Sequence, residues 1–227
     1  MDEPLVRFPG GIVAPQQWLD LLMPKLPNVP QDMIKHEVLS VLRDFCIVGG
    51  AWRDWLRPVE IDGMAYEYGL PTGNPHAETV AVLRMTRQAD AWPTDPVPPE
   101  IASPPELIKI GGRPMCYWQT QPDRFYVAPI PAIGEGPYFV LPYVSMAPLD
   151  LCGIPNWFLS QYQLAIVDGV LASLLRTAGP NYRPADADRH RAMYGAARNR
   201  SRTRAVAGYT RSTTILQAPY FARGSQR

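Results

Sequence analysis

The stretch PNWFLSQYQLAIVDGVLASLLRTAG, residues 155–179, decides the fold of the C-terminal part of the chain. Pro155 suits the first turn of a helix, Asn156 beside it is a plausible cap, and Gly179-Pro180 predicts the helix end. Apolar and small side chains recur here at helical spacing. They predict one long face of Phe158, Tyr162, Ala165, Ile166, Gly169, Val170, Ser173 and Leu174. Several of these side chains are small, so another backbone can approach this face closely.

Other helical segments can supply the partner for that face. Asp186 and Asp188 open a helix expected to reach about Ala207, because carboxylates are favoured in a first turn. In the first half of the chain, residues 14–23 predict a short helix. Residues 31–48 predict a long helix that ends at the two glycines which follow, with an apolar face of Ile34, Val38, Val41, Leu42, Phe45 and Val48. An isolated helix needs tertiary packing to be stable in water, so we expect both sets of helices to form one bundle.

Short apolar or alternating runs between Pro and Gly clusters occupy residues 57–146, a pattern typical of strands and turns. The expected strands are residues 59–61, 65–68, 79–85, 107–110, 115–119, 125–129 and 138–143. Residues 51–56 form another turn or the start of a strand. Gly111-Gly112 predicts a hairpin turn between residues 107–110 and 113–119. Tyr117/Trp118 and Trp52/Trp55 are expected to belong to the core.

Prolines are unusually frequent, with 26 in the chain. A proline cannot donate a hydrogen bond to a central strand ladder. The prolines at positions 93, 96, 98, 99, 104 and 105 therefore predict a long loop at the surface or at a sheet edge. Such a loop is suited to reaching onto a neighbouring molecule.

The predicted fold class is α+β, with a bundle of N- and C-terminal helices, an inserted β-rich domain and an extended C-terminal arm. The expected boundaries are residues 1–56 for the N-terminal helical part, 57–149 for the insertion, 150–209 for the C-terminal helices and 210–227 for the arm. The chain has 227 residues, of which 46% are hydrophobic, and this is enough for a real core.

Composition argues against several classes of protein. No apolar run approaches the 18 residues or so that a membrane helix needs. Asp2 and Glu3 are not typical of a signal peptide. The three cysteines at positions 46, 116 and 152 have no CxxC spacing, which favours a reduced, intracellular chain and disfavours a structural zinc site.

The motifs of common enzymes are missing from the sequence, which has no GxSxG, P-loop, GxGxxG or HExxH. His36 is expected to be a packed or half-exposed helix residue. Cys152 is a poor candidate nucleophile because no His lies near it in sequence. Helix N-terminal positions explain Asp186 and Asp188 better than a metal or acid/base pair does. The sequence therefore offers no strong candidate for a catalytic residue, a metal ligand or a cofactor site.

Charge is unevenly placed, although the net charge is only +1. Residues 177–227 carry ten Arg and two Asp, a balance of +8, which leaves −7 for residues 1–176. Basic charge here means Arg, whose planar fork of donors suits both protein interfaces and phosphate. Three interpretations stay open: a solvated helix face, an acidic protein partner or nucleic acid.

Several segments follow one another in a distinctive order: Phe45-Cys46, Gly50-Ala51-Trp52, Tyr68-Gly69-Leu70-Pro71, PPEL at 104–107, FYVAPIP at 125–131, and Ile154-Pro155 followed by Tyr162, Ala165-Ile166, Gly169 and Leu174-Leu175. In this order the segments resemble the head–tail connector (portal adaptor) proteins of tailed bacteriophages, especially short-tailed ones. The resemblance covers about residues 28–205, and its specificity comes from the order of the segments.

The resemblance implies a structural virion protein without catalysis. Twelve copies would form a ring between the portal and the tail or nozzle, extending the channel through which DNA leaves without sequence-specific contacts. The implied partners are the portal protein, a tail protein and further copies of the chain. The implied location is the head–tail junction of the virion, after synthesis in the host cytoplasm. The alternatives are another tail protein, such as a terminator or tail-tip component, and a nucleic-acid-binding module that uses the Arg-rich helix.

Partner contacts are expected from the Arg-rich helix and the arm, which we expect to be disordered until it binds. The candidate residues are Arg198, Arg202, Arg211, Ile215, Leu216, Tyr220, Phe221 and Arg223. Aromatic anchors such as the Tyr-Phe pair often dominate the energy of an interface, and Arg can reach acidic groups on a partner.

Overall fold

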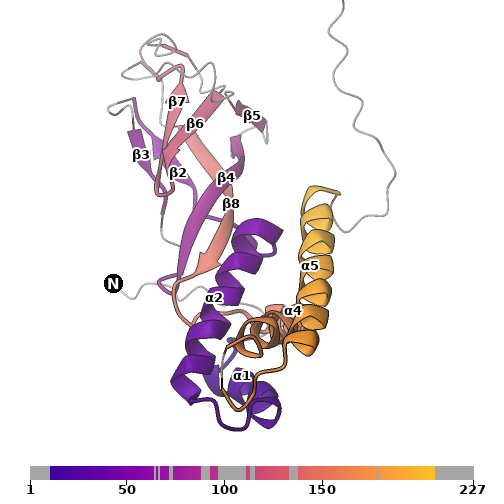
Figure 1. Ribbon diagram of the computed structural model, residues 1–227. Helices are drawn as coiled ribbons and strands as arrows, with labels where there is room; N and C mark the ends of the chain where they lie inside the picture. The colour runs from indigo at the N-terminus through magenta and orange to yellow at the C-terminus, as the bar shows by residue number, and fades with distance from the viewer. Residues whose placement is uncertain are drawn as a thin grey trace, which may run out of the picture.

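The computed structural model describes residues 11–63, 65, 67–71, 74–87, 93–96, 111–112, 116–132, 138–177 and 179–207. The helices are α1 (Pro15–Leu22), α2 (Gln31–Gly49), α4 (Asn156–Leu174) and α5 (Pro184–Ala207), with a 3-10 turn η1 (Met23–Lys25). The strands are β1 (Arg53–Trp55), β2 (Val59–Ile61), β3 (Glu67–Gly69), β4 (Ala77–Arg87), β5 (Pro93–Pro96), β6 (Cys116–Gln121), β7 (Arg124–Ala128) and β8 (Tyr138–Pro148). The protein is α+β, as predicted, with its helices at one end of an elongated molecule and its strands at the other (Figure 1).

The long strand β8 organises the sheet. β4 pairs with it antiparallel from Ala77↔Pro148 to Arg87↔Val140, while β1 and β2 pair with its residues 143–145 and 138–140. The full strand order is β1-β8-β4-β5-β6-β7-β3, with β2 also on β8. Only the β5–β6 pairing is parallel among the described strands. β8 extends to Pro148, beyond the predicted end at residue 143, and its last five residues are all buried.

The prediction that Pro93 and Pro96 mark a surface loop or a sheet edge is wrong. Both lie in β5, between β4 and β6 in the strand order. β5 has only two paired positions with each neighbour, so this short bridge needs few backbone donors. The other four prolines of that prediction lie outside the described residues. So does the expected strand at 107–110, together with most of the hairpin predicted at Gly111-Gly112.

The helix α4 begins and ends slightly differently from the prediction. Pro155 is the N-cap residue and Asn156 is already helical, so Asn156 is not the cap. The helix ends at Leu174 rather than near Gly179. After Leu174 the backbone tightens: the N–H groups of residues 176 and 177 donate to carbonyls three residues earlier.

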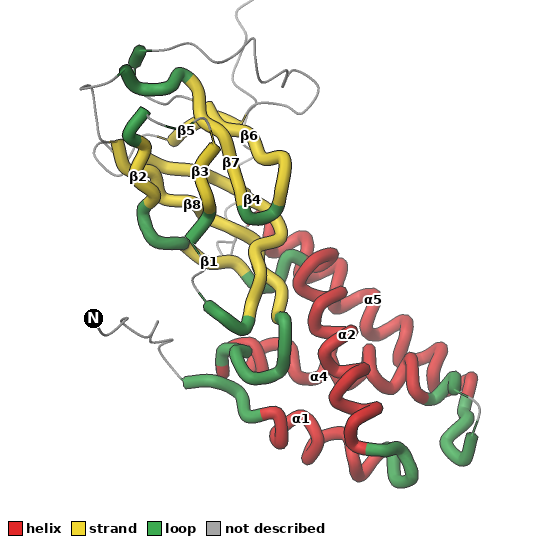
Figure 2. The backbone as a smooth tube through the Cα atoms, turned by 90° about the vertical axis from the view of Figure 1, so that its left-hand side faces the viewer, coloured by secondary structure: helices red, strands yellow, loops and turns green. Residues whose placement is uncertain are grey.

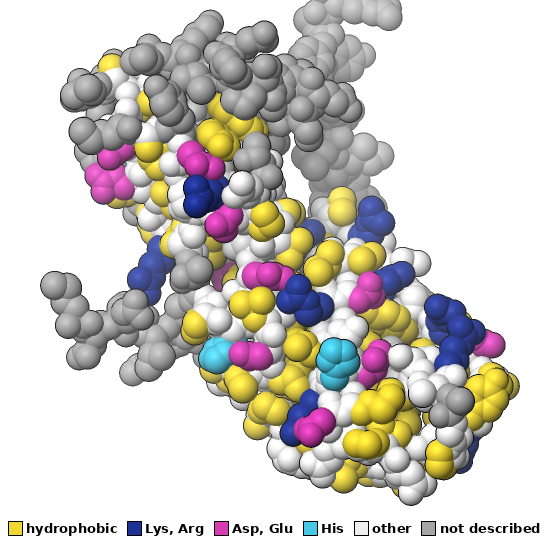
Figure 3. Space-filling view, turned by 60° about the vertical axis from the view of Figure 1, so that its left-hand side comes forward, with side chains coloured by type: hydrophobic (Ala, Val, Ile, Leu, Met, Phe, Trp, Pro, Cys, Tyr) yellow, Lys and Arg dark blue, Asp and Glu magenta, His cyan; other side chains and the backbone are white. Residues whose placement is uncertain are grey.

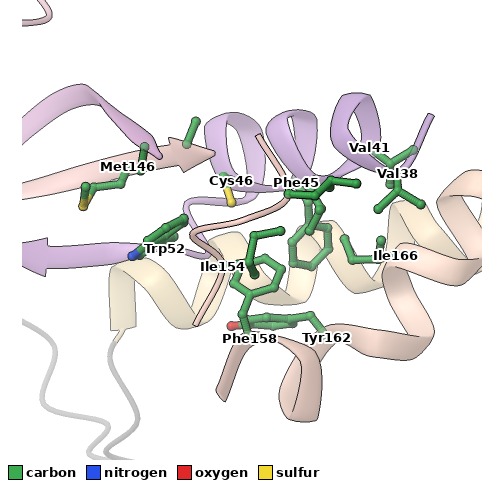
Figure 4. Close-up of a cluster of buried hydrophobic side chains, with 14 of the residues drawn as sticks. Val38, Val41, Phe45, Cys46, Trp52, Met146, Ile154, Phe158, Tyr162 and Ile166 are labelled. Carbon is green, nitrogen blue, oxygen red and sulfur yellow. The ribbon is translucent and has the colours of Figure 1, made fainter. Parts of the chain in front are cut away.

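Helices from both chain ends share one core with part of the sheet, and α2, α4 and α5 pack against one another (Figure 2). The ring of Phe45 on α2 lies between α4 and α5, with its centroid 5.0 Å from that of Tyr162 and 5.9 Å from that of Tyr194. Figure 4 shows Phe45, Tyr162 and other buried side chains converging from the helices and from the loop that carries Ile154. A Cβ on Gly169 would lie 2.5 Å from Val41 Cγ1, which explains why a small residue is needed there.

Of the tryptophans predicted to be core, Trp52 and Trp118 are buried, but Trp55 is 47% exposed. Val48, expected on the buried face of the long N-terminal helix, is also exposed. Both lie where the helices meet the sheet. The arm, residues 210–227, lies outside the described residues.

Candidate protein-binding surface

The C-terminal ends of α2 and α5 meet the sheet and leave two neighbouring hollows. The first, here called the aromatic pocket, has a volume of about 180 Å³ and is lined by Arg53, Tyr143, Trp157, Tyr162, Ser201 and Arg204, among others. The second, here called the apolar groove, has a volume of about 360 Å³ and is lined by Ile47, Val48, Val80, Leu83, Arg202 and Val206, among others. Gly50, Arg53 and Ala205 line both hollows and separate them.

Arg53 fixes the geometry of this junction. Its guanidinium donates to the carbonyl of Gly50 at 3.3 Å and to the carbonyl of Ala205 at the end of α5. Gly50 ends α2 in the left-handed region, with φ +58°. A Cβ at Gly50 would lie 3.3 Å from Ala205 Cβ and 3.2 Å from Arg53 Nη2. Glycine therefore allows both the sharp turn and the close approach of α5.

The predicted partner-binding residue Arg198 makes contacts within the chain. It donates to Asp44 at 2.8 Å, and its guanidinium lies over the ring of Tyr194, 5.7 Å from the centroid. Tyr194 also donates to Asp44, at 2.6 Å. The hydrogen bond to Asp44 raises the pKa of Arg198. The pKa of Tyr194 is also raised, mainly by burial and to a lesser degree by its hydrogen bond to Asp44. Arg198 thus ties α5 to α2, and a contact with a partner stays a prediction.

The other predicted residue on α5, Arg202, lies exposed beside the apolar groove. The remaining candidates, Arg211, Ile215, Leu216, Tyr220, Phe221 and Arg223, lie outside the described residues. Figure 3 shows Lys and Arg side chains interspersed with apolar ones over the helical end of one face.

The apolar groove was missed by the sequence analysis. Ile47, Val48, Leu83 and Val206 expose between 38% and 84% of their surface here. Contiguous exposed apolar side chains of this kind often mark protein interfaces. Helical periodicity predicts that Val48 lies on the buried face of α2. In the structure no other described element covers this face at the C-terminal end of α2, and Val48 is therefore exposed.

A second cluster joins residues that are distant in sequence. His76 Nδ1 lies 2.7 Å from Asp150 Oδ2, and the Cys152 N–H donates to Asp150 Oδ1 at 2.7 Å. Burial opposes ionisation of Asp150, but the hydrogen bonds from His76 and Cys152 outweigh it and lower the pKa of the carboxyl. His76 therefore lies near Cys152 in space although the two are distant in sequence, because β4–β8 pairing places residues 77 and 148 opposite each other. A Cβ on Gly153 would lie 2.2 Å from His76 Cβ, so this loop is held close to His76.

The other two histidines and the buried Cys46 lie apart from this cluster. His190 on α5 lies 2.8 Å from the largely buried Asp168 on α4. His36 on α2 is exposed, so it is not packed in the core. Burial raises the pKa of the Cys46 thiol, which disfavours its reactive thiolate form.

In the described part of the chain, no three His, Cys, Asp or Glu side chains gather as a metal site. Among the same residues, no helix has the length and apolar character needed to cross a membrane. Comparison with protein-family models gives no match, and comparison with curated proteins gives none.

Proposed function

We propose that the chain is a head–tail connector of a tailed bacteriophage, a structural virion protein that forms a dodecameric ring between the portal and the tail. The observation that carries the proposal is the packing of the resembling segments. Phe45 contacts Tyr162 ring to ring, and Gly50, Ala51 and Tyr162 line one pocket, although these segments lie more than 100 residues apart. Segments that resemble a family in sequence order and also pack as one unit favour a shared scaffold over chance similarity.

The proposed scaffold is a helical bundle with an inserted β-rich domain and an extended arm. A closed ring needs two different faces on each subunit, because the contact between neighbours is heterologous. The uneven charge supports such faces: Arg189, Arg191, Arg200 and Arg202 are exposed on α5, whereas residues 1–176 carry a balance of −7. In this role the chain needs no catalytic residue, cofactor or metal, and its partners are the portal, a tail protein and its own copies.

The test is electron microscopy of the purified chain, alone and mixed with portal rings of the same virus. We expect monomers or small oligomers without the portal and a twelve-fold ring beneath it. A closed ring of another symmetry would favour a different tail protein. A small oligomer that shifts on addition of DNA and ignores the portal would favour the nucleic-acid-binding alternative.

Within this proposal the arm provides attachment. Deleting residues 210–227 should leave the thermal melt nearly unchanged and abolish binding to portal-bearing heads, since the arm carries Tyr220, Phe221 and three Arg. The measurement is particle assembly with the truncated chain. Infectious particles at normal yield would show that the arm is not needed.

A further inference from the structure

A third hollow lies on the sheet, next to the apolar groove along β4. It has a volume of about 370 Å³, and its apolar lining includes Leu70, Pro71, Pro75, Pro122 and Leu149. We call it the proline-lined hollow. Leu149 at its rim is 47% exposed. None of its described lining residues belongs to a helix, so the helices of the same copy do not fill it.

The proline-lined hollow and the apolar groove carry opposite charge. Among the described lining residues, the charged ones in the hollow are Glu78 and Asp123, whereas those in the groove are Arg53 and Arg202. Two grooves facing each other would place Arg against Arg, and such like-charge contacts are unfavourable. The groove and its rim are therefore complementary to the hollow rather than to a second groove.

Asp123 is the carboxylate of the hollow that can accept a new partner. Glu78 is already paired with Arg43 on α2. The side chain of Asp123 is 71% exposed and lies 3.8 Å from Arg124, which binds Glu67 more closely, at 3.1 Å. An exposed carboxylate with so distant a partner can bind a further guanidinium without losing a strong ion pair.

The C-terminal end of α5 carries the matching groups at the rim of the groove. Val206 is 84% exposed, and Arg202, one helical turn earlier, is exposed and has no hydrogen bond or ion pair to another described residue. Residues four apart on a helix are neighbours on its surface, so the apolar and the charged group are presented together. Figure 1 shows α5 at the outer edge of the helical end, where a second molecule can reach it.

We propose that Val206 and Arg202 of one copy dock on the proline-lined hollow of a second copy, with Val206 against Leu149 and the prolines and Arg202 paired with Asp123. The two surfaces differ, so the contact is heterologous and can continue from copy to copy. One apolar side chain and one exposed ion pair make a weak contact, so the free chain should associate reversibly at high concentration. The inference rests on these two surfaces and not on the connector proposal, and its failure would leave the portal experiment unaffected.

The direct test is sedimentation velocity of the full chain over a range of concentrations, with a thermal melt of each variant to show that it is folded. Arg202→Glu and Asp123→Arg should each weaken association about tenfold, because attraction at an exposed pair becomes repulsion. The chain with both substitutions should recover most of the association, since the pair is restored with its charges exchanged. The matched control is Arg200→Glu, which makes the same charge change on the same helix outside both linings and should leave association unchanged.

Mixing the two single variants gives an independent readout. Arg202→Glu chains should associate with Asp123→Arg chains more strongly than either variant does alone, because the mixture brings together the unmodified Arg202 of one and the unmodified Asp123 of the other. Val206→Ser should weaken association about fivefold through the loss of apolar area.

Four results would overturn the proposal. They are a wild-type chain that is monomeric at every concentration, equal losses with Arg200→Glu and Arg202→Glu, no recovery in the double variant, and a mixture that associates no better than its components. Loss of portal binding by Arg202→Glu in a chain that stays monomeric would assign the end of α5 to the portal in place of a second copy.

Discussion

The helical end and the sheet are stabilised by different kinds of contact. At the helical end, Phe45, Phe158 and Ile166 are almost completely buried, and the rings of Phe45 on α2 and Phe158 on α4 lie with their centroids 6.3 Å apart. In the sheet, order depends on pairing between strands far apart in sequence, and the β4–β8 ladder shifts register at two places. At its far edge, Glu67 on β3 binds Arg124 and Tyr126 on β7 at 3.1 Å in a half-exposed position. We therefore expect larger effects of single substitutions at buried helical positions than at this half-exposed edge of the sheet.

The largest effect is expected from Ile166→Asp. Ile166 on α4 is 0% exposed, so the new carboxylate would be buried among apolar side chains without a partner. The cost is several kcal/mol, against a total stability of about 5–15 kcal/mol for a typical domain, and cooperative unfolding should be lost. The measurement is near-UV circular dichroism during a thermal melt.

The matched control for that substitution lies two residues away on the same helix. Leu164 is 74% exposed, so Leu164→Asp introduces the same charge into solvent and should change stability by less than about 0.5 kcal/mol. A cooperative melt for Ile166→Asp equal to that of Leu164→Asp would show that α4 does not bury this face.

Substitution by alanine at two glycines should change the free energy of unfolding by less than Ile166→Asp does, and in opposite directions. Gly169→Ala places a methyl group 2.5 Å from Val41 Cγ1 and 2.9 Å from the Tyr194 ring, and should destabilise by about 1–3 kcal/mol through overpacking. Gly195→Ala on α5 meets nothing within 4 Å and should stabilise by about 0.5–1 kcal/mol through helix propensity. Urea unfolding measures both. Stabilisation by both substitutions would contradict the close packing of α4 on α2 and α5.

These residues also show what could be predicted from the sequence. The faces of α2 and α4 were predictable because helical spacing is local, and the small residue at 169 pointed to a close neighbour. The sheet was predictable only as a set of strands. The prediction for Pro93 and Pro96 was wrong because strand propensity describes only the backbone of the residue itself. The position of β5 depends instead on its pairing with Met85 on β4 and Cys116 on β6.

The candidate surface was harder to predict than the core. Arg202 was chosen from its charge, but the apolar groove beside it joins α2, β4 and α5, and no sequence spacing connects those elements. The aromatic pocket likewise combines residues 53, 143, 157 and 204. Periodicity assigns a residue to a face, but whether that face is covered depends on tertiary packing. The contact between His76 and Asp150 was invisible for the same reason.

The next largest loss of stability is expected from Tyr194→Phe, which tests how α5 is attached to α2. Tyr194→Phe removes the hydroxyl that donates to Asp44, and should cost about 1–2 kcal/mol, in the range for a hydrogen bond to a charged group. Tyr182→Phe is the control, because Tyr182 is exposed and should change stability by less than about 0.5 kcal/mol. Chemical denaturation measures the difference. Equal stabilities for the two variants would assign the attachment of α5 to apolar packing alone.

The smallest effect lies where the sheet joins α4, at Asp150. Hydrogen bonds from His76 and Cys152 lower the pKa of this carboxyl in the folded state, so its stabilising contribution exists above the unfolded pKa of about 3.9. That contribution is lost as pH falls through the lower folded pKa. Because Asp150 is half exposed, we expect Asp150→Asn to cost less than about 1 kcal/mol at pH 7.

The measurement for Asp150 is urea unfolding of wild type and Asp150→Asn between pH 7 and pH 3, repeated in a His76→Ala background. The stability difference should shrink toward low pH, and it should be smaller at pH 7 without His76, since neighbouring residues that share a hydrogen bond are not additive. A difference that stays constant with pH would mean that the ionised carboxylate contributes nothing. A difference that is the same in both backgrounds would assign the effect to the Cys152 N–H alone, and the junction between sheet and helix would then be stabilised by the loop rather than by His76.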